Sequence, residues 1–458
     1  MNKAVHIVGA GLAGSEAALQ LAWRDIPVVL HEMRPLKRTD VHETDSCAEL
    51  VCSNSLKSMK PDSAAGMLKS EMEMLGSALY GAAKRHAVPA GGALAVDRHA
   101  FAEDVSRQVE SSGNIKLVRG EVSSVAELAQ DASAIVLATG PLTSDALADN
   151  IVELTGADHL AFFDAAAPIV EAESLDMDKL FRQSRYEGAE TVGDYLNAPF
   201  DKEEYETFID ELLAAKRVIA RDFESKDLFS ACQPIEEIAR AGRDAPRFGP
   251  LKPVGLTDPR TGRRPWAALQ LRAENAECTS YNLVGFQTNL TFPEQKRVFS
   301  MIPGLENAVF SRYGVMHRNT FIDAPHLLDE TLRFPRDVES VVGVPLYAAG
   351  QLSGTEGYCE AIRSGLHVAL AIAADMNGAS LPPLPRTTVF GALLAYATDP
   401  STENYQPMHV NFGIIEPLEV PIKNKGKRYA AYAERGREAL EGYVAQLESL
   451  GLMQVGPL

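Results

Sequence analysis

The sequence predicts an α/β fold in which an inserted domain interrupts one larger unit, and three features support this prediction. A short apolar strand near the N-terminus, AVHIV, runs directly into a glycine-rich turn and a helical pattern. Two later segments, 135–140 and 344–357, repeat the order of strand and glycine turn. Between them, from about residue 200 to residue 320, a charged helical stretch (201–221) precedes loops rich in Pro, Gly and Arg. This change in composition indicates an inserted α+β domain.

The first glycine turn has the spacing Gly9-x-Gly11-x-x-Gly14, which is the dinucleotide-binding fingerprint of Rossmann-like folds. The three glycines permit the tight turn, the approach of a pyrophosphate and the close packing of helix on sheet. A second apolar strand, 28–30, leads to Glu32, which is placed to accept a hydrogen bond from a ribose hydroxyl. We therefore predict that a dinucleotide cofactor is bound by Gly9, Ala10, Gly11, Leu12, Ala13, Gly14 and Glu32.

The composition is typical of a globular protein. With 458 residues, of which 46% are hydrophobic and 23% charged, the chain is long enough for two or three domains. No apolar run approaches the length of a membrane span, and the first strand begins so early that we expect no leader segment. Five cysteines in so long a chain do not form a disulfide framework, which favours a cytoplasmic location. The histidines show no metal-ligand spacing, so we expect no metal site.

Charge is distributed unevenly along this acidic chain. The formal net charge of −18 argues against indiscriminate binding to nucleic acid. Residues 240–272 nevertheless hold eight cationic side chains and only two acidic ones. From composition alone, a solvated loop surface and a binding face for a polyanion are both open interpretations.

Three of the cysteines lie in sequence contexts that suggest chemistry. Cys47 and Cys52 have the C-x4-C spacing of flavin disulfide reductases, but the chain has no second GxGxxG motif for NADPH, so this interpretation is disfavoured. Cys232 precedes the Arg-rich stretch, where a thiol pKa can fall toward neutrality and favour a thiolate nucleophile. On composition alone, a buried inert cysteine remains the simpler interpretation of each of the five.

Eight stretches carry a resemblance to a known family: ELVCSNSL (49–56), VPAGGALAVDR (88–98), ATGPLTS (138–144), SRY (184–186), FGPLKPVGL (248–256), GFQT (285–288), RYGVMHRNT (312–320) and QPM (406–408). With them the chain resembles the folate- and FAD-dependent tRNA (uracil-5-)-methyltransferases, the TrmFO family, from its first strand to near residue 440. The resemblance implies an FAD-binding fold of the GidA/glutathione-reductase type. It divides the chain into a first FAD-binding part (1–199), the inserted domain (200–319) and a second FAD-binding part with C-terminal helices (320–458).

The same resemblance implies a reaction. Methylenetetrahydrofolate supplies a one-carbon unit, and FAD, reduced by NAD(P)H, helps to transfer it and reduce it to a methyl group. The acceptor is C5 of uridine 54 in the T loop of tRNA. Because uracil C5 is a poor nucleophile, a thiolate first adds to C6 and moves electron density onto C5.

The resemblance also implies roles for individual residues. Cys232 matches the nucleophile of the family, and Cys52 matches a second catalytic cysteine near the flavin. Gly350 and Gln351 are expected at the flavin end of the cofactor. The family usually has FEGCMPIE around its nucleophile where this chain has FSACQPIE (229–236), which leaves the activation of the thiol, though not its identity as the nucleophile, an open question.

The basic stretch of the inserted domain becomes the expected tRNA face. We expect RNA contacts from Arg243, Lys252, Arg263 and Arg264. A flipped target base also needs stacking partners, for which Phe248, Trp266 and Tyr313 are candidates, although aromatic residues more often belong to the core.

Three alternatives stay open at this point. The same chemistry could act on a uridine of 23S rRNA, to which the altered surroundings of Cys232 lend some weight. An FAD-dependent oxidoreductase of small molecules would need no RNA face. A wobble-uridine modification subunit of the larger GidA type would need a long C-terminal helical domain for which this chain is too short.

Overall fold

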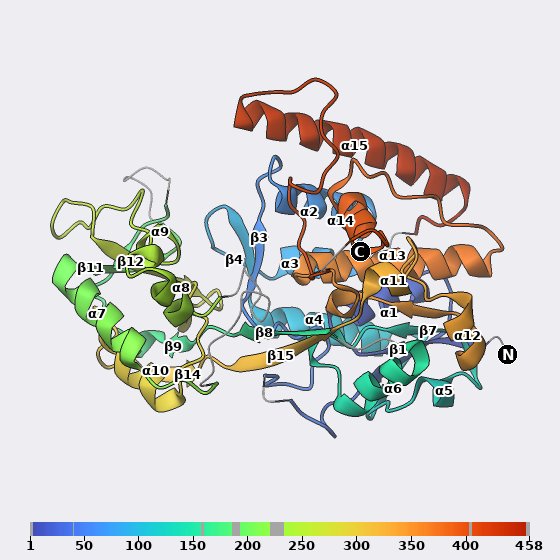
Figure 1. Cartoon of the computed structure of the whole chain (residues 1–458), viewed down its shortest axis with the longest axis horizontal. Helices are drawn as coiled ribbons and strands as arrows, with labels where there is room; N and C mark the ends of the chain where they lie inside the picture. The colour runs from blue at the N-terminus through green and yellow to red at the C-terminus, as the bar shows by residue number, and fades with distance from the viewer. Residues whose placement is uncertain are drawn as a thin grey trace.

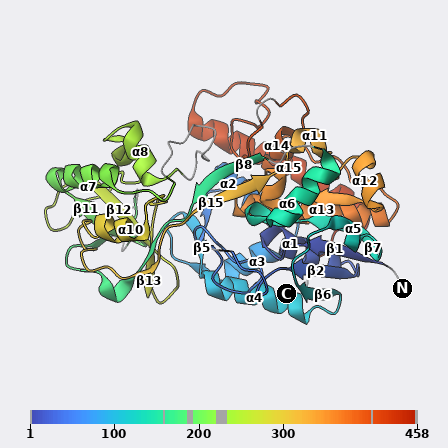
Figure 2. The same ribbon diagram turned by 60° about the horizontal axis from the view of Figure 1, so that its bottom comes forward.

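A computed structural model gives the structure of residues 3–39, 41–156, 160–185, 193–219, 233–402 and 405–454. The described chain forms two lobes joined by a pair of antiparallel strands, β8 (Leu160–Ala165) and β15 (Met316–Phe321) (Figure 1). We call the described residues between these strands the second lobe and the remainder the first lobe. Figure 2 shows the same connection from a second direction, with the lobes on either side of it.

A parallel sheet of five strands forms the centre of the first lobe. Its order is β16-β7-β1-β2-β6, and each neighbouring pair is parallel. The strands are β1 (Ala4–Val8), β2 (Val28–Glu32), β6 (Ile115–Arg119), β7 (Ala132–Leu137) and β16 (Leu346–Ala348). All three strands predicted from the glycine-turn patterns are therefore present and lie side by side in the order β16-β7-β1. The predicted α/β fold class is confirmed.

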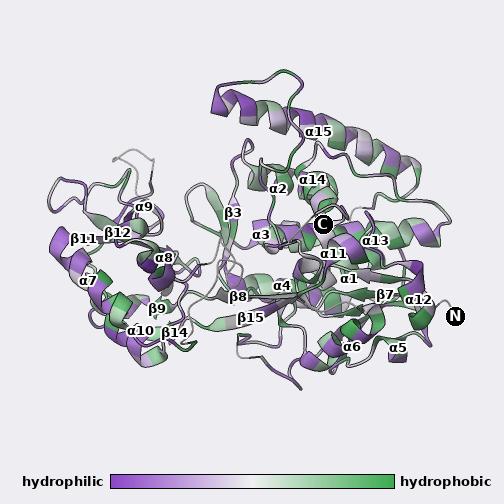
Figure 3. Ribbon diagram, viewed as in Figure 1, coloured by the Kyte–Doolittle hydropathy of each residue, from purple (hydrophilic) through white to green (hydrophobic). Residues whose placement is uncertain are grey.

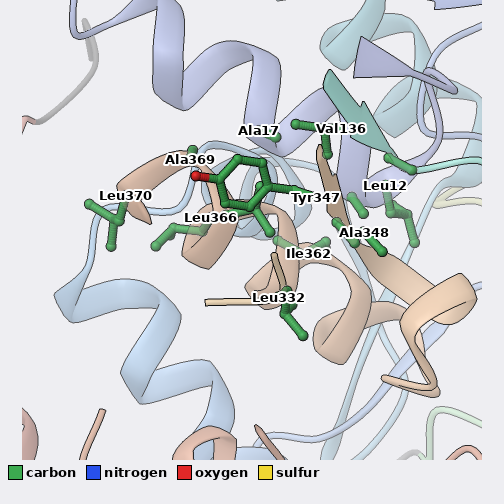
Figure 4. Packing of buried hydrophobic residues seen from close by; sticks show 14 of the residues in the cluster. Leu12, Ala17, Val136, Leu332, Tyr347, Ala348, Ile362, Leu366, Ala369 and Leu370 are labelled. Atoms are coloured by element: carbon green, nitrogen blue, oxygen red, sulfur yellow. The ribbon is translucent and has the colours of Figure 1, made fainter. Parts of the chain in front are cut away.

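The core of the first lobe lies where α1 (Leu12–Ala22) packs against α13 (Tyr358–Met376) beside the sheet. Figure 4 shows Leu12 and Ala17 of α1 close to Ile362, Leu366 and other apolar residues of α13 and the strands. The helices approach closely because α13 carries a glycine at the contact: a Cβ on Gly365 would lie 2.1 Å from the carbonyl oxygen of Ala13. This packing fixes the N-termini of both helices at the carboxyl edge of the sheet.

Other elements of the first lobe surround this core. They are β3 (Ser55–Ser58), α2 (Ala64–Met74), α3 (Ala78–Arg85), β4 (Ala87–Val88), β5 (Ala93–Val96), α4 (Arg98–Ser111), α5 (Val125–Leu128), α6 (Asp145–Thr155), α11 (Ala324–Leu327), α12 (Arg336–Val342), α14 (Val389–Ala397) and α15 (Lys425–Ser449). Helix α15 lies on top of α2 and buries one stripe, formed by Tyr432, Gly436, Leu440, Tyr443 and Leu447. Its remaining face is mostly hydrophilic (Figure 3).

The second lobe contains a sheet of six strands in the order β10-β11-β12-β13-β9-β14, with antiparallel neighbours. The strands are β9 (Ile169–Glu171), β10 (Phe181–Arg182), β11 (Leu196–Phe200), β12 (Ala267–Ala273), β13 (Ser280–Leu283) and β14 (Phe310–Arg312). The helices are α7 (Lys202–Ala214), α8 (Ile235–Ala241), α9 (Ala245–Phe248) and α10 (Phe292–Phe299). Separate helices beside an antiparallel sheet agree with the α+β character predicted for the insertion.

Two predicted limits differ in detail from the observed elements. The helical stretch predicted for 201–221 is a helix only to Ala214, although its start is well defined by a capping box between Asp201 and Glu204. The domain limit predicted between residues 199 and 200 falls inside β11, which pairs with β12 of the same sheet. The division of the chain into domains stays a prediction.

Candidate functional site

The glycine turn between β1 and α1 is shaped by close backbone contacts. Gly9 has φ +103°, and a Cβ at this position would lie 2.5 Å from the carbonyl oxygen of Ala138. A Cβ on Gly14 would lie 1.9 Å from the carbonyl oxygen of Gly9. A Cβ on Gly11, by contrast, would meet nothing within 4 Å, and no side chain caps α1 at this end. The turn therefore presents an open helix N-terminus, which suits an anionic ligand.

Glu32 lies at the end of β2, directly beside this turn. One carboxylate oxygen accepts the Ala10 N–H at 3.1 Å, and the other accepts the N–H and Nε of Arg34 at 3.0 and 2.9 Å. Burial alone would raise the pKa of Glu32, but the hydrogen bonds and charge of Arg34 outweigh it and lower that pKa. Glu32 is therefore ionised at neutral pH. Because a carboxylate offers about four acceptor positions, a ribose hydroxyl can still be bound.

Two neighbouring cavities meet at the glycine turn. Gly9, Gly11 and Glu32 line the smaller one, and Gly11, Leu12 and Ala13 line the larger one. Both also share Ala138 and Thr139 of the turn after β7. Ala10 and Gly14 belong to the same turn but line neither cavity.

The far end of the larger cavity is formed by residues from the opposite end of the sequence. Gly350 and Gln351, in the turn after β16, lie in its wall together with Tyr358, which begins α13. Gly350 has φ +74°, and its N–H donates to Ser364 Oγ at 2.7 Å. The structure thus brings the two predicted glycine turns to two adjoining cavities with shared lining residues, one bordered by Glu32 and the other by Tyr358; we call the two cavities together the groove.

Sequence reasoning missed His42, which lines both cavities. Its Nδ1 lies 2.7 Å from the Thr39 hydroxyl. Burial, together with the positive charge of Arg34, lowers the pKa of His42 to about 4, so the ring is neutral at pH 7. The residue lies in a stretch without regular periodicity, and no motif in the sequence marks it.

Cys52 lies in the wall of the larger cavity. Its backbone N–H donates to the Tyr358 hydroxyl at 2.8 Å, and the N–H of Ser53 donates to the same hydroxyl at 3.1 Å. Burial, and next the neighbouring Cys52, raise the pKa of Tyr358, which keeps its hydroxyl protonated.

Cys47 and Cys52 do not form a disulfide, since both are free cysteines. Cys47 is fully buried outside both cavities, and burial raises the pKa of its thiol to about 11. Cys359 also borders the larger cavity, and burial raises the pKa of its thiol to about 11 as well. These two thiols are poor nucleophiles at neutral pH.

The predicted nucleophile Cys232 lies outside the described residues, but the structure describes the segment that follows it, from residue 233. Glu236, in α8, is fully buried, and its carboxyl group accepts the Asn289 N–H at 2.6 Å and the Thr288 hydroxyl at 3.0 Å. Burial raises the pKa of Glu236 to about 7. These hydrogen bonds connect α8 to Thr288, the last residue of the GFQT motif, and to Asn289 after it.

The predicted RNA-contacting residues lie on the second lobe in different environments. Arg243 forms an ion pair with Asp210 at 2.6 Å, and Lys252 is half-buried. Arg263 and Arg264 are exposed, and among the described residues no carboxylate forms an ion pair with either of them. These two arginines are therefore the members of the set with the most accessible charge.

The three candidates for stacking on a target base differ in how far neighbouring side chains cover their rings. The Trp266 ring is covered by the Arg247 guanidinium, 3.6 Å from its centroid. Tyr313 is stacked between Phe292 and Phe310, at centroid distances of 4.9 and 5.2 Å. Phe248 has the Arg247 guanidinium 5.9 Å from its ring centroid, but at 78% exposure it presents an accessible ring to solvent.

Within the described ranges, no group of three or more His, Cys, Asp or Glu side chains could hold a metal ion. None of the helices described here is long and apolar enough to cross a membrane.

Comparison with known proteins gives consistent results. A family model described as "Glucose inhibited division protein A" matches residues 4–380. Two curated proteins named "Methylenetetrahydrofolate--tRNA-(uracil-5-)-methyltransferase TrmFO" are similar over almost the whole chain. The one from Geobacter sulfurreducens is 51% identical over 445 residues, covering 97% of this chain and 100% of that protein. The one from Bacillus subtilis is 48% identical over 440 residues, covering 96% and 98%.

A solved structure of Aquifex aeolicus GidA has a similar fold, with a TM-score of 0.67 at 18% identity. The match covers 98% of this chain and 79% of that one. At this identity the likeness concerns the fold alone.

Proposed function

The chain belongs to the TrmFO family, and from that membership we propose that it methylates C5 of uridine 54 in the T loop of tRNA. The supporting observation is sequence identity of 48–51% with curated methylenetetrahydrofolate–tRNA-(uracil-5-)-methyltransferases along nearly the full length. The chain is accordingly a transferase that uses methylenetetrahydrofolate as carbon donor and tRNA as acceptor. NAD(P)H is the proposed reductant.

The groove between Glu32 and Tyr358 fits FAD, the flavin cofactor of the family. The open space at Gly11 and the uncapped N-terminus of α1 suit the pyrophosphate, and Glu32 suits the adenosine ribose. Gly350 and Gln351 then border the flavin end. When bound, FAD supplies the electrons that reduce the transferred one-carbon unit to a methyl group.

The protein's own part of the reaction is carried by two cysteines. The Cys232 thiolate adds to C6 of uracil, and the electron pair of the C5–C6 double bond moves to form an enolate, which makes C5 nucleophilic. Methylenetetrahydrofolate gives up its carbon and leaves as tetrahydrofolate, and loss of the C5 proton and release of the thiolate then restore the ring. Cys52 acts as the second catalytic cysteine, in the cavity wall at the flavin end.

The RNA approaches over the second lobe. Arg243, Lys252, Arg263 and Arg264 contact phosphates, and Phe248 offers its exposed ring to a base. A tRNA substrate and a folate donor support our proposal that the enzyme acts in the cytoplasm.

Two experiments test the proposal. In a deletion strain, 5-methyluridine should disappear from position 54 of tRNA and persist in 23S rRNA; unchanged tRNA with loss from 23S rRNA would establish the ribosomal alternative. With a T-arm RNA that carries 5-fluorouridine, the wild-type enzyme should form a covalent complex and Cys232→Ala should form none. A complex that persists in Cys232→Ala excludes Cys232 as the nucleophile.

A further inference from the structure

The segment 49–54 carries Cys52 through a stretch without helix or strand, but its polar groups are held from several sides. Three buried arginine side chains donate hydrogen bonds to it: Arg98 Nη1 to the Leu50 carbonyl oxygen at 3.1 Å, Arg312 Nη2 to the Val51 carbonyl oxygen at 2.6 Å, and Arg272 Nε to Asn54 Oδ1 at 2.7 Å. Hydrogen bonds from a charged donor are about twice as strong as those between neutral groups. The conformation of the segment is therefore set by its neighbours.

Two of the three arginines come from the second lobe. Arg272 belongs to β12 and Arg312 to β14, whereas Arg98 begins α4 of the first lobe. Arg98 is in turn paired with Glu274 of the second lobe at 2.7 Å, and both side chains are 6% exposed. The Cys52 segment thus lies in the contact between the lobes.

Of the three arginines, Arg312 is the one that bonds Val51, the residue directly before Cys52. Its Nη2 also donates to the Val41 carbonyl oxygen at 3.0 Å, and its Nε lies 3.4 Å from Glu43. The guanidinium therefore joins two parts of the loop that follows β2. The carbonyl that it holds at 2.6 Å, that of Val51, belongs to the same peptide group as the Cys52 N–H.

That peptide group is held at both ends. Its oxygen accepts from Arg312 of the second lobe, and its N–H donates to the Tyr358 hydroxyl of the first lobe at 2.8 Å. A peptide group is planar, so two bonds at opposite edges fix its orientation. Because the Ser53 N–H donates to the same hydroxyl at 3.1 Å, the peptide groups on both sides of Cys52 are held. Together they set the direction of the Cα–Cβ bond of Cys52, whose side chain borders the cavity.

We propose that Arg312 is a positioning residue, which uses the second lobe to fix the Val51–Cys52 peptide group and so holds the Cys52 thiol in the cavity wall. The catalytic meaning of this contact rests on the proposed function of Cys52. The contact couples the lobe that receives RNA to the flavin end of the groove, because the thiol takes its position only when the second lobe lies against the first.

The test compares three variants of the full-length, FAD-loaded protein. Arg312→Met removes the donors, Arg312→Lys keeps a charged donor that can reach one carbonyl, and Arg182→Met is the control. Arg182 also belongs to the second lobe, but it bonds the Tyr281 hydroxyl at 2.9 Å and does not touch segment 49–54. The first readout is the rate at which iodoacetamide alkylates Cys52, followed by peptide mass spectrometry. The second is the separation of kcat from KM for tRNA.

We expect Arg312→Met to change the Cys52 alkylation rate by about fivefold or more and to lower kcat by about 10–100-fold, since displacements near 1 Å have such effects. KM for tRNA should stay within about twofold. Arg312→Lys should shift both values less in the same direction, and Arg182→Met should match the wild type.

If Cys52 in the Arg312→Met variant is alkylated at the wild-type rate, the proposal is wrong. This holds even if the variant melts at a lower temperature, because Arg312 then has a structural role only. If Arg312→Met does not fold, wild-type values in Arg312→Lys have the same meaning. Absence of 5-methyluridine formation by the wild-type enzyme would instead contradict the proposed function, and the alkylation comparison would still decide the role of Arg312.

Discussion

Gly14 lies so close to Gly9 that a Cβ on Gly14 would be 1.9 Å from the Gly9 carbonyl oxygen. Two substitutions in the same turn should therefore have different effects. Gly14→Ala should prevent α1 from packing on the sheet and yield little folded protein. Gly11→Ala adds a methyl group to open space, so its unfolding free energy without cofactor should stay near that of the wild type while FAD affinity falls at least tenfold.

Urea unfolding and titration with FAD check this pair. A Gly11→Ala variant that binds FAD like the wild type would show that the pyrophosphate does not lie against this turn.

Tyr358→Phe removes the one hydroxyl that accepts the N–H groups of both Cys52 and Ser53. Unpaired buried donors cost about 1–3 kcal/mol, so the unfolding free energy should fall by that amount. Because the peptide group before Cys52 loses one of its two bonds, single-turnover formation of 5-methyluridine should fall at least tenfold.

Tyr205→Phe is the matched control, since Tyr205 donates its hydroxyl to the Arg243 carbonyl oxygen within the second lobe. It should lose comparable stability and keep the wild-type single-turnover rate. Equal losses of rate in the two variants would mean that Tyr358 acts through stability alone.

The double variant Arg263→Ala/Arg264→Ala should bind tRNA more weakly, because both side chains are exposed and form no ion pair with a described carboxylate. Loss of two phosphate contacts should lower the slope of log K against log salt by about 1–2. Filter binding at several salt concentrations measures this slope. Arg107→Ala/Arg336→Ala, which removes two exposed arginines of the first lobe, should leave it unchanged; equal slopes for the two double variants would exclude the proposed face.

Glu236→Gln should alter the pH dependence of stability. Burial raises the pKa of Glu236 to about 7 from 4.5, so between these values the folded protein keeps a proton that the unfolded chain releases. This carboxyl group therefore makes the unfolding free energy fall as pH rises through that window and level off above it. Gln keeps an oxygen acceptor without titrating, so the variant should gain roughly 3 kcal/mol relative to the wild type between pH 4.5 and pH 7.

Urea unfolding across this pH range provides the measurement. Glu237→Gln, which changes the neighbouring carboxylate that pairs with Arg217 at 3.0 Å, serves as the control. Parallel curves for Glu236→Gln and wild type would show that Glu236 is ionised in the folded protein.

Local sequence patterns predicted the parts of the site that depend on local geometry. Gly9 and Gly14 could be assigned because each meets a steric demand of one turn, and Gly11 because it leaves that turn open to a ligand. The strand and acid at Glu32 follow at fixed spacing. The return of the chain at Gly350 was predicted from the same pattern of strand and glycine turn.

Local sequence patterns could not predict the hydrogen bonds around Cys52. Tyr358 lies 306 residues from Cys52 in sequence, and Arg312 lies 261 residues from Val51. Tertiary packing brings these groups together, within the first lobe for Tyr358 and between the lobes for Arg312. Hydrogen bonds to backbone atoms leave no pairing signal in a single sequence. His42 was missed for a related reason, because it lies in an irregular loop whose course is set by tertiary contacts.

The strand pair that joins the lobes makes the second lobe exchangeable in principle. Leu160, which begins β8, and Phe321, which ends β15, are opposite each other in register, so excision between them would cut no strand of the five-stranded sheet. A relative's lobe could be grafted at this point with a short splice. Any such chimaera would also import the side chains at positions 272, 274 and 312, so grafted lobes must be matched to the recipient's Cys52 loop as well as to its RNA.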